Sequence, residues 1–166
     1  MISKAQAFLE KQLKVIEKIY KVPLLTEVKE GNKRYDFYFP TNPPVVVECN
    51  GKQHTQDHAD GFFFKSSKQL LDYKKNDSER KLFDKIGKII LIEYTDEEFP
   101  DIDEIIKDLT ERNAIKVLEK GPDENNAYYS RIVYNQRQSE RRKELNREFR
   151  KKLKEKQRNN SWNRFK

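Results

Sequence analysis

The chain has 166 residues, of which 38% are charged and 35% are hydrophobic, and its formal net charge is +7. This length suits one compact domain with an appendage, because domains most often contain about 100 to 150 residues. No apolar run approaches the roughly 18 residues that would span a bilayer, and the N-terminus lacks the pattern of a signal peptide. We therefore expect a cytoplasmic protein without a membrane partner. The single cysteine, Cys49, excludes an intramolecular disulfide, and we interpret it as a packed residue rather than a nucleophile.

The positive charge is concentrated at the C-terminal end of the chain. Residues 131 to 166 contain 14 Lys or Arg and 4 Glu, whereas residues 1 to 130 contain 21 Lys or Arg and 24 Asp or Glu. A basic segment of this kind is typical of a polyanion-binding region, whereas the acidic remainder would not by itself indicate nucleic-acid binding.

The first 50 residues predict one helix followed by three strands. Apolar side chains recur at helical spacing after Ser3, which predicts an amphipathic helix capped by that residue. Pro23 prevents the helix from continuing, and two short runs that flank a Gly-Asn turn predict a β-hairpin. The continuous apolar run that follows predicts a strand buried on both faces. These elements span residues 3–20, 24–30, 34–39 and 45–50.

The remainder adds two helices and a strand before the composition changes. A polar helix, a second buried strand and a helix after Pro100 are predicted at residues 66–86, 88–94 and 101–112. This order predicts a mixed α/β (α+β) domain in which a central sheet is flanked by helices. Residues 120–127 have the composition of a linker. We therefore predict a body at residues 1–119 and a basic helical arm at residues 128–166.

Residues 134–158 contain no Gly or Pro, and Leu145, Phe149 and Leu153 form an apolar stripe, which predicts a long helix. Two interpretations of this arm are open and compatible. The helix docks its stripe on the body or on a second copy, or its cations follow phosphates with little sequence preference. The predicted phosphate contacts are Arg141, Arg142, Lys143, Arg147, Arg150, Lys151 and Lys154.

Two carboxylates lie on neighbouring predicted strands. Alternation places Asp36 on the side of its strand opposite to Tyr35, Phe37 and Phe39. If this strand pairs with the next one, Asp36 and Glu48 converge at one edge of the sheet. They can then share a divalent cation through oxygen ligands, as Mg²⁺ prefers. The alternative is an ordinary hydrogen-bonded Asp and a chance pair of acids.

Further polar groups follow Glu48 directly. Asn50 shares a strand face with Glu48, and the run Gly51-Lys52-Gln53-His54 supplies a tight turn, a cation, an amide and an imidazole. This concentration of chemistry favours a catalytic site over a chance pair.

These residues resemble a known family. The runs Tyr35-Asp36-Phe37-Tyr38-Phe39-Pro40 and Val47-Glu48-Cys49-Asn50-Gly51-Lys52-Gln53-His54 are similar to the PD-(D/E)xK (restriction-endonuclease-like) nuclease superfamily. The likeness is greatest to the branch of very-short-patch repair endonucleases and related phage homing endonucleases. Asp77, followed by Gly87 and the strand after it, matches the later part of that pattern. The resemblance covers roughly residues 3 to 95 and implies a restriction-endonuclease-like fold, with a mixed central sheet flanked by helices.

The resemblance also implies roles for individual residues. Asp36 and Glu48 would bind Mg²⁺, with Mn²⁺ as a substitute. The superfamily's usual lysine, two residues after the acid, is replaced here by Asn50. The group that orients or deprotonates the attacking water is therefore left among three catalytic candidates: Lys52, Gln53 and His54.

Two further positions are ambiguous. Gln6 stands where such enzymes often carry a glutamate, and Glu10 is either its substitute or an ordinary surface residue. Asp77 either contacts the site or braces its own helix.

The resemblance implies a Mg²⁺-dependent endonuclease that hydrolyses DNA phosphodiester bonds in the cytosol of a bacterium or a phage-infected host. The cut is a nick, or a double-strand break if the chain forms a homodimer, and structured DNA is among the expected substrates. Two alternatives stay open. One is a catalytically inactive nucleic-acid-binding or assembly protein, motivated by Gln6 and Asn50, and the other is an RNA-processing nuclease.

Overall fold

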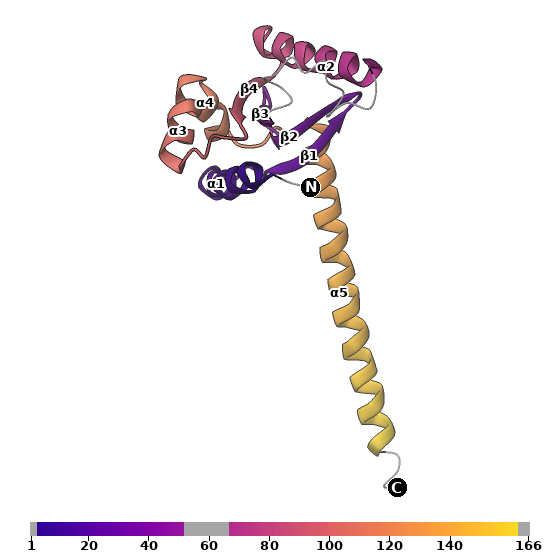
Figure 1. Ribbon diagram of the computed structural model, residues 1–166. Helices are drawn as coiled ribbons and strands as arrows, with labels where there is room; N and C mark the ends of the chain where they lie inside the picture. Colours follow the sequence, from indigo (N-terminus) through magenta and orange to yellow (C-terminus); the bar gives the residue numbers. More distant parts are fainter. Residues whose placement is uncertain (1–2, 52–66, 163–166) are drawn as a thin grey trace. The chain divides into compact units, whose positions relative to one another are not determined.

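The computed structural model describes residues 3–51 and 67–162 of the chain (Figure 1). Within these ranges it contains four strands and five helices, so the prediction of a mixed α/β class is confirmed. The chain divides into two units, residues 1–126 and 127–166, and each is described by itself. None of the described helices is long and apolar enough to cross a membrane.

Helix α1, Lys4–Tyr20, buries one face in the core. The hydroxyl of Ser3 accepts a hydrogen bond from the N–H of Gln6 at 3.0 Å, which caps the first turn as predicted. Lys21 adopts a left-handed conformation with φ 55° and ends the helix ahead of Pro23. The buried residues recur at helical spacing: Ala5, Leu9, Leu13 and Ile16.

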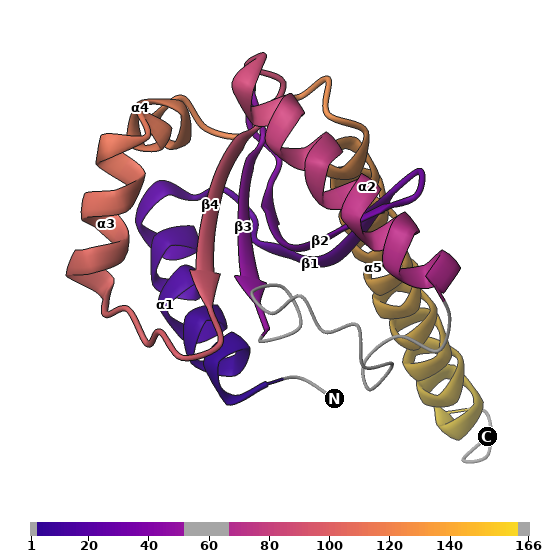
Figure 2. The ribbon, with the colours of Figure 1, turned by 45° about the horizontal axis from the view of Figure 1, so that its top comes forward.

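Four strands form one mixed sheet in the order β1-β2-β3-β4 (Figure 2). The pairs β1–β2 and β2–β3 are antiparallel, whereas β4 is parallel to β3. A parallel pair needs a crossover connection, and this one contains helix α2, Ser67–Lys85. The strands are Leu25–Glu30, Lys33–Phe39, Val45–Asn50 and Ile90–Thr95.

Different helices cover the two faces of the sheet. Helices α1, α3 (Ile102–Glu111) and α4 (Ala114–Glu119) pack on one face and enclose the main core with it. Helix α2 crosses the opposite face, as Figure 2 shows. The strand residues of the main core are Phe37, Phe39, Val45, Val47, Ile92 and Tyr94.

Helix α4 was not predicted from the sequence. Asn113, with φ 57°, separates it from α3 and starts a new helix in a different direction. Its six residues are too few to display a helical period, although Ala114 and Leu118 are both buried in the core.

The predicted alternation along β2 is wrong for Tyr35. Its ring lies 5.9 Å from the ring of Tyr38, and the charge of Arg80 on α2 acts on the pKa of its hydroxyl. Tyr35 therefore lies on the α2 face of the sheet and not beside Phe37. The break coincides with a distortion of β1, where Glu27 has φ 56° between two regular strand pairs.

The segment 120–126 joins the two units. The N–H of Asp123 donates to the carbonyl oxygen of Pro40 at 2.8 Å, and Nδ2 of Asn126 donates to the Tyr38 hydroxyl at 2.9 Å. These bonds tie the segment to the end of β2. The second unit begins with helix α5, Ala127–Trp162, which has 36 residues and extends the helix predicted at residues 134–158 at both ends.

Candidate functional site

The polar residues of interest meet where β3 and β4 end and β2 begins. Glu48 and Glu93 are direct register partners on the parallel strands β3 and β4. On the other side of β3, the pairing with β2 runs as far as Phe37 and Val47, so Asp36 is the next residue beyond the last pair. Because β2 and β3 are antiparallel, Asp36 lies beside Glu48.

The Asp36 side chain takes the place of a missing backbone partner for β3. Its Oδ2 atom accepts a hydrogen bond from the N–H of Cys49 at 3.0 Å. This contact fixes the carboxylate beside Glu48, and the Asp36 charge contributes to raising the pKa of Glu48. The structure thus brings together the two predicted metal ligands, and metal binding by them stays a prediction.

Glu48 is deeply buried, with only 4% of its surface exposed. One carboxylate oxygen, Oε2, lies 3.1 Å from Nη1 of Arg80 on α2, while the other, Oε1, is buried without a hydrogen-bond partner among residues 3–51 and 67–162. Burial raises the pKa of Glu48 to about 8, and the charges of Asp36 and Glu93 add to this shift, against the opposing effect of Arg80. Below about pH 8 the metal-free side chain therefore keeps its proton.

Arg80 is the residue that the sequence did not indicate. It is 7% exposed, and Nη1 also donates to the carbonyl oxygen of Arg34 at 3.1 Å. Asp77 lies one turn earlier on α2, with Oδ1 3.6 Å from Nη2 of Arg80 and Oδ2 3.0 Å from Lys81. Of the two interpretations of Asp77, these contacts favour the one in which it braces its own helix.

Asn50 extends the site along β3. Its Nδ2 atom donates to Oε1 of Glu93 at 3.0 Å, whereas its Oδ1 atom is buried without a hydrogen-bond partner in the part of the chain that the structure describes. Glu93 was not predicted from the sequence. The only signal for it was its place in the second buried strand, where a charged residue is unusual.

Cys49 packs against the main core, in agreement with its interpretation as a packed residue. Burial, and after it the charge of Asp36, raises the pKa of its thiol to about 11, so the thiol is protonated at neutral pH. On the first helix, Glu10 forms an ion pair with Lys14 at 3.0 Å one turn later, which favours the interpretation of Glu10 as a surface residue.

The predicted proton-handling residues lie outside the described residues. The description of this strand and turn ends at Gly51 and resumes at residue 67. The roles of Lys52, Gln53 and His54 therefore stay predictions.

The donor set suits a hard cation. Within residues 3–51 and 67–162, no three His, Cys, Asp or Glu side chains lie close enough to hold a metal by themselves. Mg²⁺ does not need such a cage, because it is commonly bound through one or two carboxylates and keeps several waters. Asp36 and Glu48 supply two carboxylates, and two of the buried oxygens without partners in the described part of the chain, Oε1 of Glu48 and Oδ1 of Asn50, are acceptors that a cation would satisfy.

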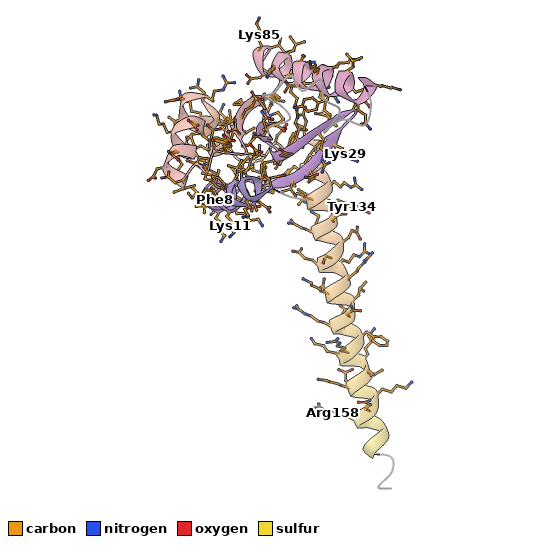
Figure 3. The ribbon with its side chains drawn as sticks, in the orientation of Figure 1. Phe8, Lys11, Lys29, Lys85, Tyr134 and Arg158 are labelled. Atoms are coloured by element: carbon orange, nitrogen blue, oxygen red, sulfur yellow. The ribbon has the colours of Figure 1, made fainter. Side chains whose placement is uncertain are left out.

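The predicted phosphate-binding residues all lie on α5 and are exposed. Side chains project from this helix on all sides, as Figure 3 shows between the labelled Tyr134 and Arg158. Four of the basic residues follow one face at intervals of three and four residues: Lys143, Arg147, Arg150 and Lys154. The three residues of the apolar stripe, Leu145, Phe149 and Leu153, are exposed as well.

Comparison of the chain with models of protein families, with curated proteins and with solved structures found no match. The function of the site is therefore inferred from its own residues, their contacts and their charges.

Proposed function

We propose that this chain is a Mg²⁺-dependent endonuclease that hydrolyses phosphodiester bonds in DNA. The observation that carries the proposal is the buried carboxylate of Glu48, which lies beside Asp36 and has one oxygen without a donor among the described residues. A buried charge is unfavourable unless it is paired, and Arg80 pairs with the other oxygen only. A divalent cation held by Asp36 and Glu48 would compensate the rest.

A restriction-endonuclease-like fold is part of the same proposal. The chain order of one helix, three antiparallel strands, a crossover helix and a fourth strand parallel to the third supports it. Both acids lie on the strands where the resemblance of the sequence to PD-(D/E)xK nucleases locates them, and they meet at one edge of the sheet. The fold would thus bring the acids together through strand pairing, and side-chain contacts then fix them.

A bound Mg²⁺ would neutralise charge on the scissile phosphate and lower the pKa of a water ligand. The positions of both side chains are fixed before a metal binds: the N–H of Cys49 holds Asp36, and Arg80 holds Glu48. Donors and acceptors that need no reorganisation during the reaction are the most effective ones in catalysis. Removal of the water proton is assigned to His54 or Lys52, and Gln53 is a candidate only for orienting the water.

The helical arm supplies substrate affinity in this proposal. Its exposed cations contact phosphates without reading bases, so they increase binding to any DNA and leave specificity to the body. A nick requires one catalytic centre, whereas a double-strand break requires a second copy of the chain or a second event.

The proposal is tested with the variants Asp36→Asn and Glu48→Gln. Both changes remove a charge and keep an acceptor, so the bonds to the Cys49 N–H and to Arg80 can still form. We expect Mg²⁺-dependent nicking of supercoiled plasmid to fall at least about 100-fold in each variant, with DNA binding retained.

Glu79→Gln is the matched control, because Glu79 on α2 forms an ion pair with Lys33 of β2 and takes no part in the proposed site. Nicking at the wild-type rate by both site variants would refute the assignment. Parallel assays on single strands, branched DNA and RNA identify the substrate and test the RNA-processing alternative.

The second candidate function is a catalytically inactive nucleic-acid-binding or assembly protein. Two observations favour it: Asn50 stands where the superfamily usually has a lysine, and Arg80 already forms an ion pair with Glu48. This alternative is supported if the purified chain binds DNA but neither binds Mn²⁺ nor nicks plasmid.

A further inference from the structure

Glu48 and Asn50 lie on the same face of β3, and one polar atom of each side chain is held by a partner. Arg80 holds Oε2 of Glu48 at 3.1 Å, and Glu93 holds Nδ2 of Asn50 at 3.0 Å. The opposite ends, Oε1 of Glu48 and Oδ1 of Asn50, are both buried and have no hydrogen-bond partner within residues 3–51 and 67–162. Two oxygens are therefore left unpaired two residues apart on one strand.

The orientation of the Asn50 amide follows from its partner. An ionised carboxylate only accepts hydrogen bonds, so the end of the amide that faces Glu93 must be the NH₂ group. The carbonyl oxygen is consequently turned away from Glu93. If the amide were flipped, two acceptor oxygens would face each other, which is unfavourable.

An unpaired buried acceptor is unfavourable unless another group satisfies it. For Oδ1 of Asn50, a cation is a better candidate than a second donor, because two acidic side chains lie near it: Glu48 on the same face of β3 and Asp36 on the neighbouring strand β2. Amide and carboxylate oxygens are ligands that suit Mg²⁺ and Mn²⁺.

We propose that Asn50 is a third ligand of the divalent cation, through Oδ1, and that Glu93 is the positioning residue that turns this oxygen toward the metal. The proposal rests on the proposed function and deepens it. The replacement of the family's lysine by Asn50 then exchanges a cation for a metal ligand. The metal site then has three side-chain oxygen ligands, and Arg80 is the side chain that brings positive charge to it.

The test measures binding of Mn²⁺ to the full chain without nucleic acid, by the decrease of the free Mn²⁺ signal in electron paramagnetic resonance. Asn50→Ala removes the ligand, and we expect its Mn²⁺ dissociation constant to rise about tenfold or more. Asn50→Asp loses the donor to Glu93 but keeps an oxygen and adds a charge, so its affinity should equal or exceed that of the wild type. Glu93→Ala removes the fixed acceptor, and loss of such an orienting partner typically weakens metal binding by about 10- to 100-fold.

Two matched controls accompany these variants. Asn76→Ala removes an asparagine that donates to the carbonyl oxygen of Asn32 elsewhere in the body, and Glu79→Gln neutralises a glutamate outside the site. Both should bind Mn²⁺ as the wild type does. Circular dichroism of every variant confirms that it is folded, and Asn50→Asp keeps the test decisive if Asn50→Ala does not fold, because a loss of affinity in this variant contradicts the proposal.

Wild-type affinity in Asn50→Ala overturns the assignment of Asn50. If Asp36→Asn and Glu48→Gln abolish Mn²⁺ binding in the same experiment, the proposed function stands and only the third ligand is refuted. Absence of Mn²⁺ binding by the wild-type chain overturns both.

Discussion

Glu48 combines two properties that usually exclude each other, deep burial and a surplus of neighbouring negative charge. Asp36 on β2 and Glu93 on β4 both act on it, and Arg80 on α2 is the cation that faces it among the described residues. Together with burial these groups raise its pKa to about 8. Strongly shifted groups of this kind are concentrated at functional sites, although structural ion pairs produce them too.

The shift predicts how the metal-free protein responds to pH. The folded pKa of Glu48, about 8, lies above the ordinary value of 4.5, so between these values the folded state holds a proton that the unfolded chain releases. The free energy of unfolding should therefore fall as the pH rises through this window. Glu48→Gln cannot titrate and should remove this part of the dependence. Thermal unfolding followed by near-ultraviolet circular dichroism measures it, and identical pH dependence in the two proteins contradicts the assigned shift.

Asp36 and Glu48 were predicted from the sequence because carboxylates are conspicuous within apolar strands. Their partners were not predicted, because the contacts are distant in the sequence: Asn50 and Glu93 are 43 residues apart. Arg80 is one of many basic residues on a polar helix, and only the packing of α2 on the sheet distinguishes it from Lys81 beside it.

At the scale of elements, α5 differs from every other helix of the chain that the structure describes. It continues for 36 residues without Gly or Pro, and beyond Tyr134 nearly every described residue is exposed. Its sequence was sufficient to predict a helix, since no tertiary contact had to be foreseen. Elements defined by tertiary contacts were harder to predict: α4 is too short to show a period, and the break of alternation at Tyr35 coincides with a positive φ at Glu27 on the neighbouring strand.

The arm should bind DNA through one face rather than through net charge alone. Replacing the four aligned cations by Gln should lower the slope of log affinity against log salt by about 0.9 for each phosphate that the arm no longer neutralises, equally for different DNA sequences. These cations are Lys143, Arg147, Arg150 and Lys154. Fluorescence anisotropy with a labelled duplex at several salt concentrations measures the slope.

The control carries the same change of net charge in the body, through Gln at four exposed lysines of α1 and α3: Lys11, Lys14, Lys18 and Lys107. It should leave the slope close to that of the wild type. An equal effect of both sets would show that the arm has no special role.

For the whole molecule, the division of charge matches the division into two units. Residues 131 to 166 carry 14 Lys or Arg and 4 Glu, whereas residues 1 to 130 carry a small excess of acids. An acidic body does not attract DNA by itself, so the proposed nuclease depends on its arm for encounter with the substrate. The order of the elements in the body could be predicted from local sequence patterns, because most of its long elements have their own hydrophobic pattern and α2 stands out as a polar run between two apolar strands.

The central claim is that a divalent cation is bound by Asp36 and Glu48. Diffraction from crystals of the full chain soaked in Mn²⁺, recorded near the manganese absorption edge, tests it most directly. We expect an anomalous peak in contact with both carboxylates in the wild type and its loss in Glu48→Gln. A peak elsewhere, or none at Mn²⁺ concentrations that support cleavage, would contradict the claim.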